Sequence, residues 1–356
     1  MLRFTVLDAT LFIASVLAVL LVAAAVATAV LATRIDRRFP AEGKFITVNG
    51  TRLHYVDEGP RTAMPVLLIH GASSNIRDML GPMRQQLGQR YRLIAIDRPG
   101  HGWSERGTNH NSPDAQARTL ADALGALGVD KAIIYGHSFG AAVATALAVE
   151  RPDKVAGLLV AAPATHPWPS GTTNWYNHFA RLPFVGWLFT RTIALPAGLQ
   201  RLPAATACVF SPNRMPDDYL ARTGVELVLV PRRFMANSID LTGLHGHTTA
   251  FAPRYAGITA PTIIIAGEHD NVVSKDIHAV SLAKAVPGAQ LFLVPNIGHK
   301  PDYVLADLVA AAIDTLAGTP RDLAAIAKTM ADVVAADRFG PLEACPPPYN
   351  ANAVQA

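Results

Sequence analysis

The sequence predicts an α/β fold with a mostly parallel, doubly wound sheet. Short, unbroken apolar runs alternate with helical segments through most of the chain after residue 60. An unbroken apolar strand needs cover on both faces, and a helix between two strands lets them run side by side in the same direction. The predicted strands are 65–69, 92–96, 131–135, 155–161, 261–266 and 290–294, and the predicted helices are 76–87, 113–127, 141–150, 275–285 and 301–316.

An antiparallel hairpin is expected before the first of these strands. Residues 45–48 and 51–56 form two short alternating runs around the pair Asn49-Gly50. Asn-Gly suits the left-handed backbone of a two-residue hairpin turn. We therefore expect this hairpin to form an edge of the sheet.

The composition indicates a folded protein with a large core. Of the 356 residues, 50% are hydrophobic and 16% are charged, which fits one large α/β domain with insertions or two ordinary domains. The net charge of +4 is not gathered in a dense basic run, so nucleic-acid binding is not expected. Two cysteines, Cys208 and Cys345, are too few for a disulfide framework and lack metal-ligand spacing. We expect two unpaired thiols, and their number does not settle the redox compartment.

The amino-terminal segment is long and apolar enough to cross a membrane. Residues 9–33 carry no charge, and 25 helical residues exceed the roughly 30 Å of a bilayer core. A buried core helix and a cleaved signal peptide are the alternatives, the latter with Ala25-Val26-Ala27 as a cleavage site. The apolar run continues past that site, so we expect a retained single-pass anchor.

Basic residues bear on the orientation of this anchor. Arg34, Arg37 and Arg38 follow the span, whereas Arg3 alone precedes it. The positive-inside tendency slightly favours a body on the cytoplasmic side. A short amino-terminal tail can override so small a bias, and the side of the membrane stays open.

An inserted cap is expected between residues 163 and 250, where the alternation of strands and helices lapses. This segment carries three of the four tryptophans, Trp168, Trp175 and Trp187. Its aromatic side chains either form a core of their own or face the substrate, and both readings can hold for different residues. In a third reading residues 182–199 dip into the membrane surface, which Arg191 and several prolines disfavour.

The carboxyl-terminal part predicts one more helix and a loose tail. Thr319 as a cap and Pro320 in the first turn suit the start of a helix over residues 319–337. The segment 341–356 is rich in proline and is expected to be loose.

The candidate nucleophile is Ser138, in the pentapeptide Gly136-His137-Ser138-Phe139-Gly140. A predicted strand precedes this serine and a predicted helix follows it, which places it on a sharp turn, the nucleophile elbow. Side chains two residues before and after the serine would collide with the neighbouring strand and helix, so glycine is needed there. A serine hydroxyl is a poor nucleophile unless a base takes its proton.

The candidate base and its carboxylate partner lie in loops that follow later strands. His299 comes shortly after strand 290–294, at the edge where the functional loops of a parallel sheet gather. The loop after strand 261–266 offers Glu268 and Asp270. Asp270 lies deeper in the loop and is preferred, with Glu268 as the alternative. His70, His101 and His137 are expected to have structural roles.

An acyl-transfer site also needs two donors directed at the developing oxyanion. The backbone N–H of Phe139 begins the elbow helix and suits this role. The second donor is expected in the turn after His70-Gly71, as the backbone N–H of Ala72.

With these motifs the chain resembles the α/β-hydrolase superfamily, in the group that includes carboxylesterases, proline iminopeptidases, perhydrolases, epoxide hydrolases and C–C bond hydrolases. The resemblance covers residues 44–317 and rests on motifs that occur in the family's order. These are His70-Gly71, Asp97-x-Pro-Gly-x-Gly-x-Ser104, the Ser138 elbow, Gly267-x-x-Asp270 and Gly298-His299. It implies Ser138 as nucleophile, His299 as base, Asp270 as its orienting acid, and Ala72 and Phe139 as oxyanion donors.

The resemblance also narrows the expected chemistry. The elbow holds serine where epoxide hydrolases and haloalkane dehalogenases hold aspartate, which disfavours those activities. The turn His70-Gly71-Ala72-Ser73 differs from the His-Gly-Gly-Gly turn of one class of lipases and esterases. We expect hydrolysis of an apolar carboxylic ester through an acyl-enzyme, without a metal or organic cofactor. Amide, peroxy-acid and C–C bond chemistry, and a non-catalytic binding role, stay open.

Overall fold

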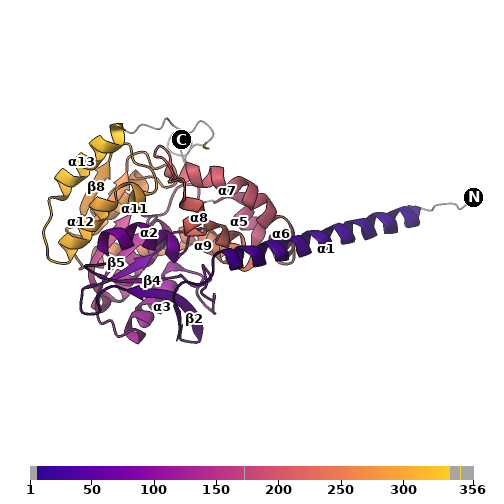
Figure 1. Ribbon diagram of the computed structural model, residues 1–356, viewed down its shortest axis with the longest axis horizontal. Coiled ribbons are helices and arrows are strands. Elements are labelled where there is room, and N and C mark those ends of the chain that lie inside the picture. Colours follow the sequence, from indigo (N-terminus) through magenta and orange to yellow (C-terminus); the bar gives the residue numbers. More distant parts are fainter. Residues whose placement is uncertain (1–5, 172, 337–344, 346–356) are drawn as a thin grey trace, which may run out of the picture.

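An eight-stranded sheet forms the centre of the computed structural model, which describes residues 6–171, 173–336 and 345 (Figure 1). The strand order is β1-β2-β4-β3-β5-β6-β7-β8, in which β2 is antiparallel to both neighbours and β3 to β8 run parallel. The strands are β1 (Lys44–Val48), β2 (Thr51–Glu58), β3 (Pro65–Ile69), β4 (Arg92–Ile96), β5 (Ala132–His137), β6 (Val155–Ala161), β7 (Thr262–Gly267) and β8 (Gln290–Val294). The predicted fold class, edge hairpin and strands are confirmed, each strand within two residues of its predicted bounds.

Helices cover both faces of this sheet because its central strands are apolar on both faces. In β3, Leu67 and Ile69 belong to one buried cluster, and Val66 and Leu68 belong to the other. The first cluster is covered by α3 (Pro113–Ala126), α4 (Phe139–Glu150) and α10 (Ser281–Ala285), and the second by α2 (Ile76–Leu87), α12 (Ala306–Leu316) and α13 (Leu323–Ala336). Side chains that alternate between the two faces of each strand therefore pack against helices on both sides, which gives a sheet between two layers of helices.

Three predicted helices differ from the observed ones, two because they are divided and one because it begins later. Segment 275–285 divides into a π-helical turn, η4 (Asp276–Val280), and α10, and segment 301–316 divides at Leu305 into α11 (Pro301–Val304) and α12. The helix predicted over 319–337 begins at Leu323, so the prediction that Thr319 caps it is wrong. Asp322 is the cap, since its Oδ1 accepts a hydrogen bond from the Ala325 N–H at 3.0 Å. Of the predicted loose tail 341–356, the structure describes Cys345 alone.

The segment between β6 and β7 is helical, and we call residues 163–251 the cap. It contains α5 (Trp175–Ala180), α6 (Val185–Thr192), α7 (Ala194–Phe210), α8 (Tyr219–Thr223), η2 (Val225–Leu229) and α9 (Pro231–Phe251). Within it Phe189 packs against Phe179 and Phe234, at ring-centroid separations of 5.2 and 6.2 Å. These aromatic side chains form a core for the cap itself.

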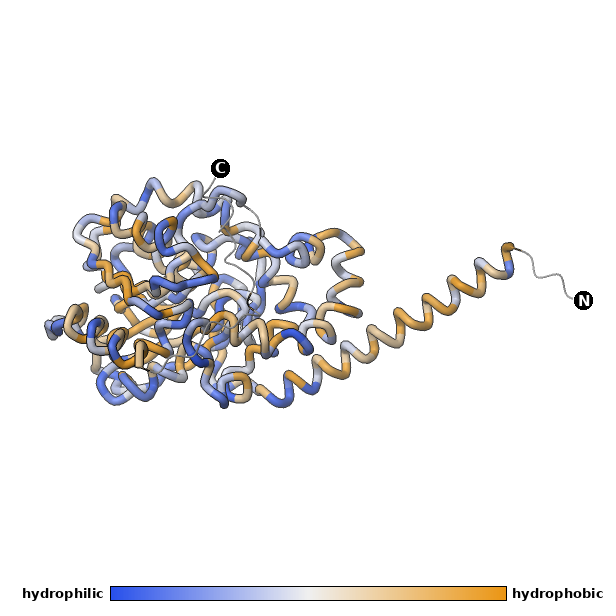
Figure 2. Tube along the Cα trace, turned by 90° about the horizontal axis from the view of Figure 1, so that it is seen from above, coloured by the Kyte–Doolittle hydropathy of each residue, from blue (hydrophilic) through white to orange (hydrophobic). Residues whose placement is uncertain are grey.

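The long apolar helix α1 (Val6–Arg38) projects from the body beside the cap (Figure 1). It is the one helix in the described part of the chain that is by itself long and apolar enough to cross a membrane. Figure 2 shows that it is hydrophobic along most of its length and turns hydrophilic close to the body. Its last turns pack on the cap, where Ile35 is buried in a cluster with Leu195 and Leu227.

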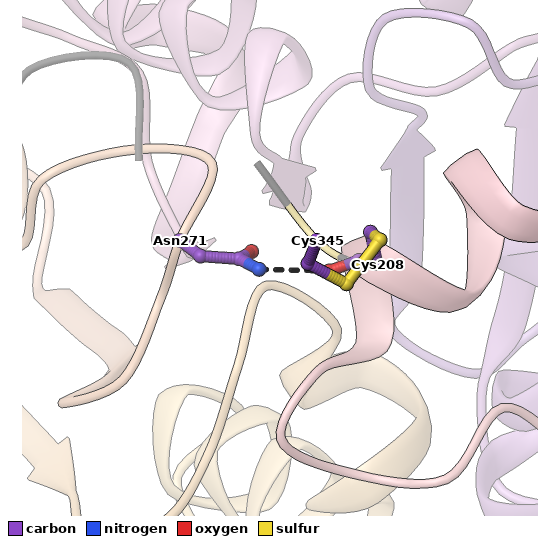
Figure 3. The surroundings of a disulfide bond; sticks show 3 residues. All are labelled: Cys208, Asn271 and Cys345. Carbon is purple, nitrogen blue, oxygen red and sulfur yellow. Dashed lines mark hydrogen bonds between the residues drawn. A yellow bond between two sulfur atoms is a disulfide. The ribbon is translucent and has the colours of Figure 1, made fainter. Parts of the chain in front are cut away.

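The two cysteines form a disulfide, so the prediction of two unpaired thiols is wrong. Cys208, near the end of α7, is bonded to Cys345, with the two Cα atoms 5.4 Å apart (Figure 3). The two residues are separated by 137 positions, and a sequence alone does not reveal a pairing over such a distance. The bond ties the cap to a residue that follows α13.

A buried polar cluster fastens the cap to the loop after β4. Arg98 is fully buried, and its Nη1 donates to Asp240 Oδ2 of α9 at 2.6 Å. His101 Nε2 donates to the same oxygen at 2.8 Å, and Arg106 pairs with Oδ1 at 2.7 Å. Burial by itself raises the pKa of Asp240, but the charge of Arg98 and the His101 hydrogen bond outweigh it and hold that pKa below its usual range.

The same arginine holds the turn that follows β3. Arg98 Nε and Nη2 donate to the carbonyls of His70 and Gly71, at 3.0 and 3.1 Å. His70 Nε2 accepts the backbone N–H of Arg98 at 3.0 Å, which leaves its Nδ1 to donate to the Gly71 carbonyl at 2.8 Å. Asn237 of α9 accepts the N–H of Ser73 at 2.7 Å. The predicted structural roles of His70 and His101 are therefore confirmed.

We predict that Asp240→Asn greatly destabilises the folded protein. The substitution leaves the Arg98 guanidinium buried without its opposing charge, a change that typically costs about 3–5 kcal/mol. The matched control is Asp217→Asn, because the ion pair of Asp217 with Arg214 is exposed and its loss should cost less than about 1 kcal/mol. Urea unfolding of both variants in detergent measures the difference, and equal unfolding midpoints would contradict the structural role given to Asp240.

We also predict that stability falls as the pH drops from about 6.5 to about 4. Burial lowers the pKa of His101, His247 and His278 to about 4, so in this window the unfolded chain binds more protons than the folded one. As the pH falls through this window, each histidine lowers the free energy of unfolding by up to about 1.4 kcal/mol per pH unit. Its contribution to stability is fully present only above its pKa in the unfolded chain. Burial raises the pKa of Asp302 to about 6, so this one carboxyl group stabilises the folded state as the pH falls. Three histidines act in the other direction, and stability is expected to fall.

Urea midpoints recorded between pH 7.5 and 4.5 test this dependence. The variant His278→Gln should show a shallower decline than the parent, whatever its absolute stability. A stability that stays constant over this range would contradict the neutral state assigned to the buried histidines.

Candidate active site

Ser138 lies at the turn between β5 and α4, with a backbone conformation that few residues adopt. Its φ is 53° and its ψ is −119°. A side chain at Gly136 would collide with the carbonyl of Gly140, and one at Gly140 would collide with the carbonyl of Ile69. Two glycines therefore allow strand and helix to approach closely enough to hold the serine in this strained turn.

Ser138, His299 and Asp270 form one chain of hydrogen bonds. Ser138 Oγ lies 2.9 Å from His299 Nε2, and Asp270 Oδ2 lies 2.8 Å from His299 Nδ1. A carboxylate is an acceptor, so His299 Nδ1 carries the proton and Nε2 is left to accept the serine hydroxyl. The arrangement can move a proton from the hydroxyl to the imidazole and hold the resulting imidazolium against a carboxylate.

The loop after β7 places the carboxylate of Asp270 at the imidazole. Asp270 Oδ1 accepts the backbone N–H groups of Val272 and Val273, at 2.8 and 3.0 Å, which orients Oδ2 toward His299. The side chain of Asp270 is 1% exposed. Glu268, the alternative acid, is exposed, and its backbone N–H donates to the Val294 carbonyl. The geometry brings Asp270, and not Glu268, to the histidine.

The two expected oxyanion donors flank the serine. Phe139 is the first residue of α4, and Ala72 follows the turn that Arg98 holds by its carbonyls. In the described part of the chain, the backbone N–H of neither residue donates to a protein acceptor. Gly71 lies close to the serine, since a Cβ there would come within 3.2 Å of Ser138 Cβ. The turn after β3 is therefore adjacent to the reacting hydroxyl.

His137 supports the backbone of the neighbouring histidine. Its Nε2 donates to the His299 carbonyl at 2.8 Å, and the two imidazole rings are 5.1 Å apart. Burial and the nearby charge of Lys300 lower the pKa of His137 well below its usual value, which keeps the ring neutral. Its role is structural, as expected from the sequence, but it reaches the His299 loop as well as the elbow.

A buried charged group lies directly after His299. Lys300 Nζ is 3.0 Å from Asp78 Oδ2 and 2.9 Å from Asp302 Oδ2, and all three side chains are buried. The hydroxyl of Tyr219, in the cap, donates to Asp78 Oδ1 at 2.8 Å. This cluster joins α2, the cap and the start of α11, so it restricts the movement of the loop that carries the imidazole.

Two asparagines that the sequence did not single out connect the cap to the acid and histidine loops. Asn213 follows α7; its Oδ1 accepts the N–H of Gly298 at 2.9 Å, and its Nδ2 donates to the Asn296 carbonyl at 2.8 Å. Asn271 Nδ2 donates to the carbonyl of Cys208 at 3.0 Å, beside the disulfide (Figure 3). Asparagines in loops are common, so no sequence signal distinguished these from solvated ones.

The site is closed in this structure. Ser138 is 9% exposed and His299 is 4% exposed. Within the described residues, no three histidine, cysteine or carboxylate side chains gather in a group that suits a metal ion.

Comparisons with known proteins agree with this geometry. A family model described as alpha/beta hydrolase fold matches residues 64–301. Haloalkane dehalogenase 2 of Mycobacterium tuberculosis is 30% identical over 287 residues, covering 77% of this chain and 94% of the relative. The 2-hydroxy-6-oxononadienedioate/2-hydroxy-6-oxononatrienedioate hydrolase of Cupriavidus pinatubonensis is 26% identical over 275 residues, covering 72% and 88%.

A solved structure of a membrane phospholipase A, a bacterial virulence factor, has the same fold, with a TM-score of 0.57 at 21% identity over 89% of this chain and 99% of its own. The family model covers most of the sheet and both sides of the elbow turn. Together with the fold and the elbow, these matches show that this chain belongs to the alpha/beta-hydrolase superfamily.

Proposed function

We propose that this protein is a membrane-anchored serine hydrolase that cleaves an apolar carboxylic ester through an acyl-enzyme. The observation that carries the proposal is the hydrogen-bonded chain of Ser138, His299 and Asp270, with distances of 2.9 and 2.8 Å. Nucleophile, base and orienting carboxylate are the three groups that this chemistry needs.

In the proposed reaction, Ser138 Oγ attacks the ester carbonyl while its proton passes to His299 Nε2. The carbonyl oxygen becomes negative and accepts the backbone N–H groups of Ala72 and Phe139. Collapse of this intermediate breaks the bond to the alcohol, which leaves with the proton from His299. Water then adds to the acyl-enzyme by the same steps in reverse, the acid is released and Ser138 regains its proton.

Dehalogenation is disfavoured, although a haloalkane dehalogenase is 30% identical to this chain. Displacement of a halide by the hydroxyl of Ser138 would form an alkyl ether. Water does not hydrolyse an ether under these conditions, whereas it does hydrolyse the ester that a carboxylate nucleophile would form. The serine at the elbow therefore supports acyl transfer.

Hydrolysis of a C–C bond is the second candidate, because several relatives at 25–28% identity are 2-hydroxy-6-oxononadienedioate/2-hydroxy-6-oxononatrienedioate hydrolases. Such a substrate carries two carboxylates, whereas an apolar ester carries none. Turnover of a dienedioate of this class and of neutral esters of graded length, compared on the same preparation, separates the two candidates.

We predict that Ser138→Ala abolishes hydrolysis of p-nitrophenyl esters and labelling by a fluorophosphonate. His299→Ala should lower kcat at least about 1,000-fold, and Asp270→Asn should have a similar effect because the tautomer of His299 is no longer enforced. The matched control is Glu268→Gln, whose carboxylate does not reach His299 and whose kcat should stay within about twofold of the parent.

The measurement is steady-state hydrolysis together with gel-based fluorophosphonate labelling. Unchanged activity in Ser138→Ala would reject the serine as nucleophile. A larger loss in Glu268→Gln than in Asp270→Asn would reverse the assignment of the acid.

The proposal also retains α1 as an anchor. Thr28 at its buried side donates to the Thr192 carbonyl of the cap at 3.4 Å, and Asp36 pairs with the buried Arg233 at 2.5 Å. Cleavage after Ala27 would cut the helix immediately before the part that packs on the body. These contacts support an uncleaved helix, continuous from the span into the folded body.

The disulfide favours a body that lies on the oxidising side of the membrane. A bond between Cys208 and Cys345 persists outside the cytosol and is rare within it. This argues against the cytoplasmic orientation that Arg34, Arg37 and Arg38 slightly favour. All three arginines lie beyond Thr28, where the helix already meets the body, and Arg38 pairs with Glu226 of the cap.

We predict that an alkaline phosphatase fused after the carboxyl end is active, and that the matching green fluorescent protein fusion is dark. The intact mass of the membrane-extracted protein should include residues 1–27. The reverse pattern of the two fusions would establish the cytoplasmic orientation, and a mass lacking those residues would identify α1 as a cleaved signal.

A further inference from the structure

The cap exposes a group of large apolar side chains on one side. Among the described residues, nine large hydrophobic side chains outside α1 are exposed, and six of them lie between residues 175 and 193. We call these six the cap patch: Trp175, Leu182, Phe184, Val185, Trp187 and Ile193, with exposed fractions from 43% to 76%. So dense an apolar group on a folded surface indicates contact with a partner.

Most of the cap patch lies outside the core of the cap, although the Trp175 ring also contacts Phe179 and Phe189, at centroid separations of 6.1 and 6.3 Å. Phe179, Phe189 and Phe234 already pack against one another inside the cap. The two exposed rings Phe184 and Trp187 are stacked outside that core, with centroids 6.5 Å apart and planes 14° apart. These rings add little to the packing of the cap, so their exposure needs another explanation.

The cap patch directly adjoins α1. Ile193 follows Thr192, whose carbonyl accepts the hydroxyl of Thr28 on α1. Helix α6 lies beside the body-proximal end of α1 (Figure 1). The apolar surface of the helix therefore lies next to the cap patch.

The depth of this contact follows from the length of the helix. Asp8 is the last charged residue before the apolar run, and Thr28 lies 28 − 8 = 20 residues further along. Twenty helical residues rise about 30 Å, which is the thickness of the hydrocarbon core of a bilayer. With Asp8 at one boundary of that core, Thr28 and Thr192 lie at the other, which is the level where tryptophan side chains concentrate in membrane proteins.

The charges around the cap patch also suit a position at the boundary of the hydrocarbon core. The sequence has no aspartate or glutamate between Asp153 and Asp217, whereas Arg181 and Arg191 are exposed beside the patch. The Arg191 guanidinium lies 4.7 Å from the ring centroid of Trp187. An arginine next to an interfacial tryptophan suits lipid phosphates, so Arg191, which from the sequence disfavoured membrane contact of residues 182–199, is compatible with it in this arrangement. In a twofold contact between two copies of this face, the same arginines would meet each other without an acidic partner.

We propose that the cap patch is a membrane-docking face, held in the polar–apolar interface of the bilayer that α1 crosses. The inference rests on the anchor proposed above and adds a second point of attachment to it. Trp175, Phe184 and Trp187 enter the interface as apolar anchors, and Arg181 and Arg191 contact the phosphates. The cap then lies between the bilayer and the closed site, so an apolar ester reaches Ser138 from the membrane when the cap moves.

Quenching of tryptophan fluorescence by brominated phosphatidylcholine tests this proposal in the full chain. The protein is reconstituted in vesicles of phosphatidylcholine, either unmodified or brominated, in which phosphatidylglycerol makes up about one fifth of the lipid. The variant Trp175→Phe/Trp187→Phe removes both tryptophans of the cap patch, and the control Trp103→Phe/Trp168→Phe removes the two partly buried ones. Circular dichroism melts establish that both variants fold.

In brominated vesicles the control, which emits from the cap patch alone, should lose emission by at least about twofold, because interfacial tryptophans lie within reach of the bromines. The parent should also be quenched, but less, because Trp103 and Trp168 add emission that the bromines do not reach. The variant without the cap-patch tryptophans should lose less than about a tenth. Measurements use protein that stays with the vesicles after alkaline extraction, which tests the anchor separately. Retained protein without quenching would overturn the docking face and leave the anchor standing, whereas protein lost on extraction would overturn both.

A second copy of the chain is the competing occupant. If the parent is unquenched and forms a dimer that Phe184→Asp dissociates in analytical ultracentrifugation, the patch is a dimer interface and the proposal is wrong. Quenching that persists in a monomeric parent supports it.

Discussion

The site depends on the left-handed backbone of Ser138, which the surrounding sheet and helix must hold. A non-glycine residue in such a conformation costs about 1–3 kcal/mol unless its surroundings impose it. Here the Ser138 N–H donates to the Ala161 carbonyl of β6 at 3.0 Å, and the Ser138 carbonyl accepts the Ala141 N–H at 2.9 Å. The strand beside the elbow and the helix after it thus restrain the turn from both ends, and the glycines at 136 and 140 let them approach.

The other groups of the site depend on the cap as much as on the sheet. Asn213 binds the loop of His299, and Asn271, next to Asp270, binds the carbonyl of Cys208. On the opposite side, Asp240 holds Arg98, which in turn fixes the carbonyls before Ala72. A cap that opened as a rigid lid would break hydrogen bonds to three loops at once.

Sequence patterns predicted the sheet and the proximity of Ser138, His299 and Asp270 well because both depend on local order. Alternation of apolar runs is a property of neighbouring residues, and Ser138, Asp270 and His299 each follow a strand whose end is recognisable. The Arg98–Asp240 pair joins residues 142 positions apart, so no local pattern announces it. The Thr319 cap was wrong for a different reason: Thr319 belongs to the end of the preceding helix, since its N–H donates to the Asp314 carbonyl of α12.

The proposed membrane attachment and the closed site place opposite demands on the cap. Exposed tryptophans are stabilised when they leave water for the membrane interface. The buried Arg98–Asp240 cluster, which fastens the cap to the body, instead requires ordered packing that excludes water. The molecule separates the two demands in space. The cap patch lies on α5, on α6 and just before α7, beside α1. The Asp240 carboxylate that holds Arg98 lies on α9, beside the turn after β3. In the proposed attachment, the half of the cap that carries the cap patch would face lipid, and the half that faces the elbow keeps the turn after β3 in place.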